Sequence, residues 1–190
     1  MRKLEEKILK EGEILPGHIL KVGSFLNQQV DVDFLMEMGA EIARLYAGCP
    51  ITKILTIESS GIAIAFAAAA ALHIPLLFAK KSPSSNLSGG VYSAKIHSYT
   101  HGNDYTAVLG KEYLTADDKV LLVDDFLANG EAIRGLREIA KGAGAECVGA
   151  AIAIEKGFQH GGDALRKEGF RVESLAIVEE MSEASLTFRR

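Results

Sequence analysis

Four consecutive apolar residues, Val120–Val123, run directly into two acids, Asp124 and Asp125, and this junction limits the folds open to the chain. A short apolar run closed by carboxylates predicts a buried strand of a parallel sheet, with its carboxyl end at the solvent. Ligands of open α/β sheets bind at that edge. The loop that follows, Ala128–Ala132, consists mostly of small residues and leads into a predicted helix over 130–141. Its free N–H groups favour an anion, and the acids can accept hydrogen bonds from vicinal hydroxyls. The pattern therefore predicts a sugar phosphate site.

Apolar runs and helical patterns alternate through the middle of the chain. This alternation predicts an α/β protein with a central, mostly parallel sheet that helices cover on both faces. The first 30 or so residues and the end of the chain do not fit the alternation. We expect residues 1–30 and 155–190 to form a small cap over the carboxyl edge of one domain, 1–190. The strands are expected at 19–22, 54–57, 74–79, 119–123, 148–154 and 172–177, with a hairpin over 91–109, and the helices at 4–10, 31–47, 61–72, 130–141 and 163–168.

The composition narrows the class of protein. The chain has 190 residues, of which 48% are hydrophobic, and this suits one domain with a substantial core. A net charge of −4 gives no basic footprint, so we expect no nucleic-acid partner. The longest apolar stretch, 61–72, is too short to span a membrane. Cys49 and Cys147 lack metal-ligand spacing, which predicts buried thiols and a cytoplasmic protein.

A second loop has the same design as the first. Ser59, Ser60 and Gly61 follow a predicted strand and open a predicted helix, so they offer N–H groups and hydroxyls to another anion. On its own this pattern is also that of an ordinary helix N-cap. Lys80 and Lys81 end the next strand, where they either neutralise an anion or form a solvated pair of charges.

The string from Val120 to Ile133 resembles the phosphoribosyl-diphosphate (PRPP) signature of the type I phosphoribosyltransferases. Asn129 and Glu131 differ from the commoner Thr-Gly-Gly loop, and the Asn-Gly-Glu variant is similar to that of bacterial members that act on xanthine. The resemblance continues over essentially the whole chain, through 20–29, 58–61 and 154–158. It implies the type I phosphoribosyltransferase fold, in which the cap is called the hood.

The resemblance assigns roles to individual positions. The acids would be catalytic and bind the ribose hydroxyls, the first loop would hold the 5-phosphate, and the second loop with the lysines would bind diphosphate. An ammonium at Lys156 would donate to an oxygen of a 6-oxopurine, with a ring stacked on it and a hood amide at its edge. The implied residues are, for catalysis, Asp124 and Asp125; for PRPP, Ala128, Asn129, Gly130, Glu131, Ala132, Ser59, Ser60, Gly61, Lys80 and Lys81; and for xanthine, Leu20, Asn27, Lys156 and Phe158.

The implied activity is transfer of the 5-phosphoribosyl group from PRPP to N9 of xanthine. The alternatives are a hypoxanthine or guanine enzyme, and a purine-responsive regulator that binds PRPP without turnover. Mg²⁺ would arrive with PRPP and not occupy a protein metal site. A homodimer is implied, with the 91–109 hairpin as a shared surface. The segment 82–100 would close over the substrate, with Tyr92, Ser93 and Lys95 as candidate contacts.

Overall fold

The structure is a computed structural model that describes residues 1–81, 89–98, 103–182 and 185–190. Its elements follow one another in this order: α1 (Arg2–Glu11), β1 (Glu13–Leu15), β2 (Ile19–Lys21), the π-helical turn η1 (Gly23–Asn27), α2 (Val32–Leu45), β3 (Lys53–Ile57), α3 (Gly61–Leu72), β4 (Leu76–Ala79), β5 (Val91–Ser98), β6 (Asn103–Gly110), η2 (Lys111–Tyr113), β7 (Lys119–Leu127), α4 (Glu131–Ala143), β8 (Glu146–Lys156), η3 (Gly157–Gln159), α5 (Gly161–Lys167), β9 (Val172–Met181) and β10 (Leu186–Phe188).

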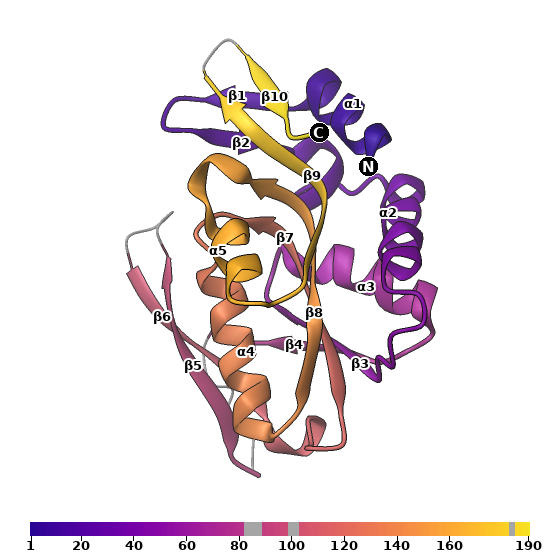
Figure 1. Ribbon diagram of the computed structural model, residues 1–190, viewed down its shortest axis with the longest axis vertical. Coiled ribbons are helices and arrows are strands. Elements are labelled where there is room, and N and C mark those ends of the chain that lie inside the picture. Colours follow the sequence, from indigo (N-terminus) through magenta and orange to yellow (C-terminus); the bar gives the residue numbers. More distant parts are fainter. Residues whose placement is uncertain (82–88, 99–102, 183–184) are drawn as a thin grey trace.

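A six-stranded sheet forms the centre of the molecule, with the strand order β10-β9-β8-β7-β3-β4 (Figure 1). Every neighbouring pair is parallel except β9 with β10. The hairpin β5–β6 lies beside α4, and β4 is an edge strand. The prediction of a mostly parallel sheet flanked by helices is confirmed. Within the described residues, no helix is long and apolar enough to cross a membrane.

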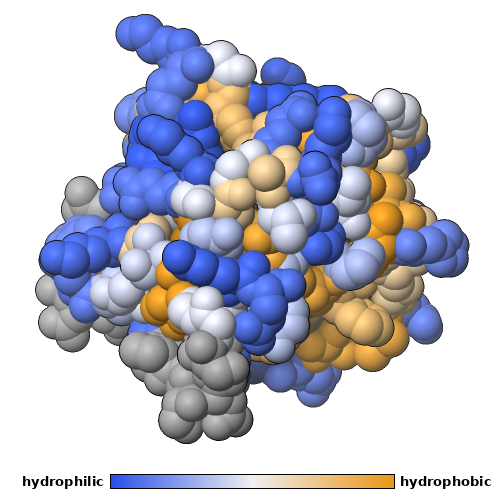
Figure 2. Space-filling model, turned by 90° about the horizontal axis from the view of Figure 1, so that it is seen from below, coloured by the Kyte–Doolittle hydropathy of each residue, from blue (hydrophilic) through white to orange (hydrophobic). Residues whose placement is uncertain are grey.

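A hydrophobic area on the surface lies over α3. Figure 2, which views the molecule from below, shows this area on the right-hand side, where α3 lies in Figure 1. Phe66 of α3 is 59% exposed and Phe78 of the edge strand is 42% exposed. A cavity of about 470 Å³ opens beside Phe66 and extends to His73 and Pro75.

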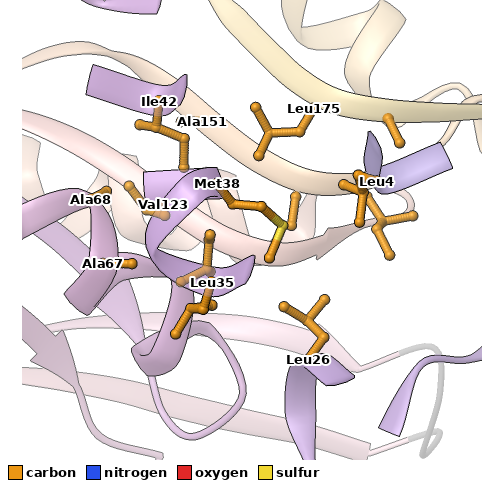
Figure 3. Close-up of a cluster of buried hydrophobic side chains, with 14 of the residues drawn as sticks. Leu4, Leu26, Leu35, Met38, Ile42, Ala67, Ala68, Val123, Ala151 and Leu175 are labelled. Carbon is orange, nitrogen blue, oxygen red and sulfur yellow. The ribbon is translucent and has the colours of Figure 1, made fainter. Parts of the chain in front are cut away.

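The two faces of the sheet carry separate cores. Along β7, Leu121 and Val123 pack with α2 and α3, whereas Val120 and Leu122 pack on the opposite face with α4. This is the alternation that a strand buried on both faces requires. Figure 3 shows Met38 of α2 among the side chains of the first core, which come from α1, from η1 and from the sheet, including its strand β9.

Helices α2 and α3 pack closely because small residues face each other. A side chain at Gly39 of α2 would place its Cβ 2.8 Å from the Cβ of Ala67 in α3, so only glycine fits there. The run of alanines in α3 follows from the same requirement, since larger side chains would push the helices apart. Asp31 is the N-cap of α2, as predicted, and its carboxylate accepts a hydrogen bond from the N–H of Phe34 at 3.2 Å.

The two ends of the chain lie side by side at the top of Figure 1, where β1, β2 and α1 meet β9 and β10. Arg190 and Glu5 form an ion pair at 2.9 Å, and the N-terminal amine donates to the carbonyl of Leu175. We call this region the hood; it consists of residues 1–30 with η3, β9 and β10.

Several expectations about the elements were wrong. Strand β7 continues through the two acids to Leu127, because its pairing with β8 extends to Glu155. Strand β9 is not the last strand, since β10 folds back on it. The short strand β1 was not expected. Cys49 and Cys147 are half-buried free thiols, and not buried ones.

Candidate active site

Three segments that are far apart in the sequence meet at the carboxylate of Asp125. The hydroxyl of Ser60 donates to its Oδ1 at 2.9 Å, and the amide of Asn27 donates to its Oδ2 at 3.1 Å. The carboxylate therefore joins the loop before α3 to the hood. The hydroxyl of Ser60 does not cap α3, so the ordinary N-cap alternative does not describe this loop.

Asp124 has different surroundings from its neighbour, although both acids are buried. Its Oδ1 accepts from the backbone N–H of Asp125 at 3.0 Å. Burial raises the pKa of Asp124 well above its usual range, and the negative charge of Asp125 raises this pKa further.

Gly61 lets the second loop approach Asp124. A Cβ at this position would lie 2.6 Å from Oδ1 of Asp124, and it would also strike the hydroxyl of Thr56. That hydroxyl is buried and has no hydrogen-bond partner among the described residues. The start of α3 is thus held directly against the acid by the absence of a side chain.

The first loop forms a small cavity at the start of α4. All of Ala128–Ala132 line this cavity of about 160 Å³, and Lys81 and Tyr105 line it as well. Gly130 has a left-handed backbone with φ of +87°, which turns the chain from β7 into α4. The site has the shape expected of an anion cradle: a short loop, the start of a helix, and a cation facing both.

The second loop is tied to the end of β4. The backbone N–H of Lys81 donates to Oε1 of Glu58 at 2.6 Å, and the Lys81 ammonium lies 5.2 Å from the centre of the Tyr105 ring. Lys81 therefore faces the cavity that Ala128–Ala132 line. Lys80 is held through its backbone, which exchanges hydrogen bonds with Val108 of β6.

The residues expected at the base lie at the hood. The ammonium of Lys156, the last residue of β8, donates to the carbonyl of His18 at 3.1 Å, and burial lowers the Lys156 pKa. The rings of Phe158 and His18 lie 5.7 Å apart. Leu20 is buried in the core beneath β2. The structure thus groups Lys156 and Phe158 around the β1–β2 turn, while Asn27 contacts Asp125.

One buried ion pair was missed by sequence reasoning. Glu155 is fully buried, and its two oxygens accept from Arg166 of α5 at 2.9 and 2.6 Å, while Ser174 also donates to it. The available signal was a glutamate between an apolar strand and Lys156. A buried carboxylate requires a partner, but the sequence does not say which cation supplies it.

The expected closing segment is only partly described. Residues 82–88 and 99–102, which include His101, lie outside the described residues. Tyr92 was a candidate contact, but its ring lies beside Gly142 and 5.4 Å from Lys111, at the far end of α4 from the first loop. Lys95 pairs with Thr106 in the β5–β6 hairpin.

The geometry defines an α/β protein with two strand-to-helix loops, a carboxylate pair and a cation at the carboxyl edge of its sheet. Residues 28–182 match the phosphoribosyl transferase domain family. The chain is 49% identical over 188 residues to the xanthine phosphoribosyltransferase of Heliobacterium modesticaldum, covering 99% of this chain and 100% of that relative. It is 51% identical over 192 residues to the enzyme of the same name from Bifidobacterium longum, covering 100% of both.

The solved structures that resemble it share the fold at low identity. The adenine phosphoribosyltransferase of Giardia lamblia, complexed with 9-deazaadenine, has a TM-score of 0.78 and 22% identity, covering 94% of this chain and 98% of that chain. The enzyme of Thermoanaerobacter pseudethanolicus has a TM-score of 0.73 and 18% identity, covering 92% and 98%. This chain belongs to the phosphoribosyltransferase family.

Proposed function

We propose that the protein transfers the 5-phosphoribosyl group of PRPP to N9 of xanthine, which yields xanthosine 5-monophosphate and diphosphate. The observation that carries this proposal is the convergence on Asp125, where Ser60 and Asn27 both donate to one buried carboxylate. A phosphoribosyl donor has an anion at each end and hydroxyls between them, so it needs two anion loops with an acceptor in the middle. Relatives named for xanthine match the whole chain at about half identity.

Different residues bind the different parts of PRPP. Ala128–Ala132 bind the 5-phosphate through backbone N–H groups, and Ser59–Gly61 with Lys81 bind the diphosphate. Lys80 adds positive charge beside Lys81. Asp124 and Asp125 accept from the ribose hydroxyls, and the charge on Asp125 stabilises the positive charge that develops on the ribose.

Mg²⁺ is part of the substrate in this proposal. Asp124 and Asp125 offer oxygen donors, and these suit a hard cation that keeps part of its water. The ion neutralises the leaving diphosphate when it is bound.

The base lies under the hood. When the purine binds, the ammonium of Lys156 gives up its hydrogen bond to the carbonyl of His18 and donates to the 6-oxygen of the purine instead. Adenine carries an amino group there, which cannot accept from an ammonium. Phe158 stacks on the ring, Leu20 packs behind it, and Asn27 bonds its edge.

The reaction needs no covalent enzyme intermediate. The C1–O bond of PRPP breaks, its electron pair leaves with diphosphate, and the N9 lone pair of the base forms the new C1–N bond from the opposite face. The N9 proton passes to solvent. The protein contributes by holding the two substrates in line and by placing a carboxylate beside the ribosyl cation. The hood excludes water, which would otherwise capture that cation.

We also propose that the protein acts as a cytoplasmic homodimer. The free cysteines fit a reducing compartment. The exposed Phe66 and Phe78 lie on α3 and on the edge strand β4, and a second copy would cover this surface. The large hydrophobic side chains that are exposed within the described residues avoid the β5–β6 hairpin, so we place the dimer contact on α3 and β4 instead.

One experiment tests the activity and its rivals together. The protein is mixed with PRPP, Mg²⁺ and, in turn, xanthine, hypoxanthine, guanine and adenine, and both diphosphate and the nucleotide product are measured. The highest kcat/KM with xanthine is expected. A higher value with hypoxanthine or guanine would replace the proposed substrate. PRPP binding without diphosphate release for any base would indicate a regulator.

A further inference from the structure

Two consecutive glycines begin α5, one residue after the turn η3 that contains Phe158. Gly161 and Gly162 are both buried, and neither has the left-handed backbone that would by itself require glycine. Helix propensity does not explain the two glycines either, because alanine forms helices more readily than glycine does. A reason for glycine must therefore come from what surrounds these residues.

Gly161 lies against the backbone of the 5-phosphate loop. A Cβ there would be 2.5 Å from the carbonyl carbon of Asn129 and 2.7 Å from the nitrogen of Gly130, and it would also strike the oxygen of Ala128. These atoms belong to the backbone, so they cannot rotate away as a side-chain tip can. A methyl group at Gly161 would displace the loop that forms the phosphate cradle.

Gly162 lies against Glu155 instead. A Cβ there would be 2.5 Å from Cδ and 2.8 Å from Oε2 of Glu155. This carboxylate cannot swing aside, because Arg166 holds both of its oxygens and it is fully buried. The displacement would pass to the backbone of Glu155 and to the next residue, Lys156.

We propose that Gly161 and Gly162 are positioning residues that set the phosphate loop and the base lysine from one point on α5. Gly161 fixes the place of the 5-phosphate, and Gly162 fixes Lys156 through the Glu155–Arg166 pair. The assignment of Lys156 to the purine rests on the proposed function. The consequence is that two adjacent substitutions of the same kind affect different substrates.

The test compares Gly161→Ala with Gly162→Ala. Steady-state kinetics gives KM for PRPP and for xanthine separately, and calorimetry gives the Kd of PRPP with Mg²⁺ and of xanthine. Gly161→Ala is expected to raise the PRPP constants roughly 10- to 100-fold, since small displacements of a binding group have effects of this size. Gly162→Ala is expected to raise the xanthine constants about tenfold and to leave those of PRPP within about twofold.

Matched variants separate positioning from general damage. Gly142→Ala introduces a methyl group into α4 whose nearest neighbour is Tyr92 Cδ1 at 3.3 Å, and it should leave both sets of constants unchanged. Leu165→Val shortens a side chain that lies beside Gly130 of the phosphate loop, and Arg166→Lys weakens the pair that holds Glu155; neither variant adds an atom. If an alanine variant does not unfold cooperatively, the corresponding milder variant replaces it, with the same expected substrate.

Equal effects of the two glycine variants on both substrates, or no effect of either, would overturn the inference. The wild-type protein could make no nucleotide while the two glycine variants still change the PRPP and xanthine binding constants separately, as predicted. That result would refute the proposed activity and leave the positioning roles standing.

Discussion

The side-chain amide of Asn27 donates a hydrogen bond of 3.1 Å to Oδ2 of Asp125, although 98 positions separate the two residues in the sequence. The bond joins the hood to the central sheet at the carboxylate that also accepts from Ser60. A residue that we assign to the purine is therefore in contact with one that we assign to the ribose. In the proposed reaction the two substrates would meet at this point, because the new bond forms between the purine and the ribose.

Asp125→Asn should lower kcat about 100-fold with a much smaller change in the KM for the base. The substitution keeps the shape and the acceptor oxygen but removes the charge that stabilises the ribosyl cation. Steady-state kinetics checks this result. Asp117→Asn, at an exposed acid, is the matched control and should leave kcat unchanged. An unaltered kcat in Asp125→Asn would remove this carboxylate from the reaction.

Asp124→Asn should change how the free energy of unfolding depends on pH. The unfolded aspartate loses its proton near pH 4, whereas burial keeps the native carboxyl protonated to a higher pH. Between these two pKa values the native state binds more protons, so wild-type stability falls as the pH rises, by at most about 1.4 kcal/mol per pH unit. Asparagine does not titrate, so the variant should lack this fall.

Urea unfolding of both proteins from pH 4 upward measures this difference. The free energy of unfolding of Asp124→Asn should rise relative to that of the wild type as the pH increases. The curve of Asp117→Asn against pH should run parallel to that of the wild type. Parallel curves for Asp124→Asn and the wild type would mean that the native pKa of Asp124 is not raised.

Gly130→Val should abolish PRPP binding while the fold survives. Valine is strained at φ of +87°, so the backbone of the phosphate cradle must change its course. Calorimetry with PRPP and Mg²⁺ measures the loss. Gly169→Val is a matched control, because Gly169 has φ of +80° with nothing within 4 Å of an added Cβ. It should lose similar stability but retain PRPP binding, and normal PRPP affinity in Gly130→Val would exclude the cradle.

Lys156→Met should raise the KM for xanthine roughly 10- to 100-fold, which corresponds to one charge-assisted hydrogen bond. The KM for PRPP should stay within about twofold. Methionine keeps the length and the apolar stem of lysine and removes only the ammonium, which lies 5.9 Å from the centre of the Phe126 ring. Lys167→Met, at an exposed position of α5, serves as the control. An equal rise in both KM values would mean that Lys156 has another role.

Phe66→Glu should convert the proposed dimer to a monomer, because a carboxylate cannot be buried against a second apolar surface without a partner. Sedimentation equilibrium measures the mass directly. Leu9→Glu changes a side chain that is 62% exposed on α1, away from α3, and should leave the mass unchanged. A monomeric wild-type protein, or a Phe66→Glu variant that remains dimeric, would contradict the proposed contact.

The sequence predicted the sheet and its loops because their signals are local. The apolar run before Asp124, the small residues after it and the repeated strand–loop–helix pattern each lie within a few residues. The position of β10 could not be predicted in the same way, since a three-residue strand pairs only through contacts with β9. The Glu155–Arg166 pair also escaped prediction, because periodicity shows that a charge is buried but not which distant charge meets it.

The hydrogen bond from Lys156 to the carbonyl of His18 has a practical consequence for engineering. The β1–β2 turn holds the lysine at rest, so the turn sets how readily the ammonium becomes available to an incoming purine. Exchanging residues 13–21 for the corresponding segment of a relative with another preferred purine would therefore alter the choice of base, even with Lys156 itself retained.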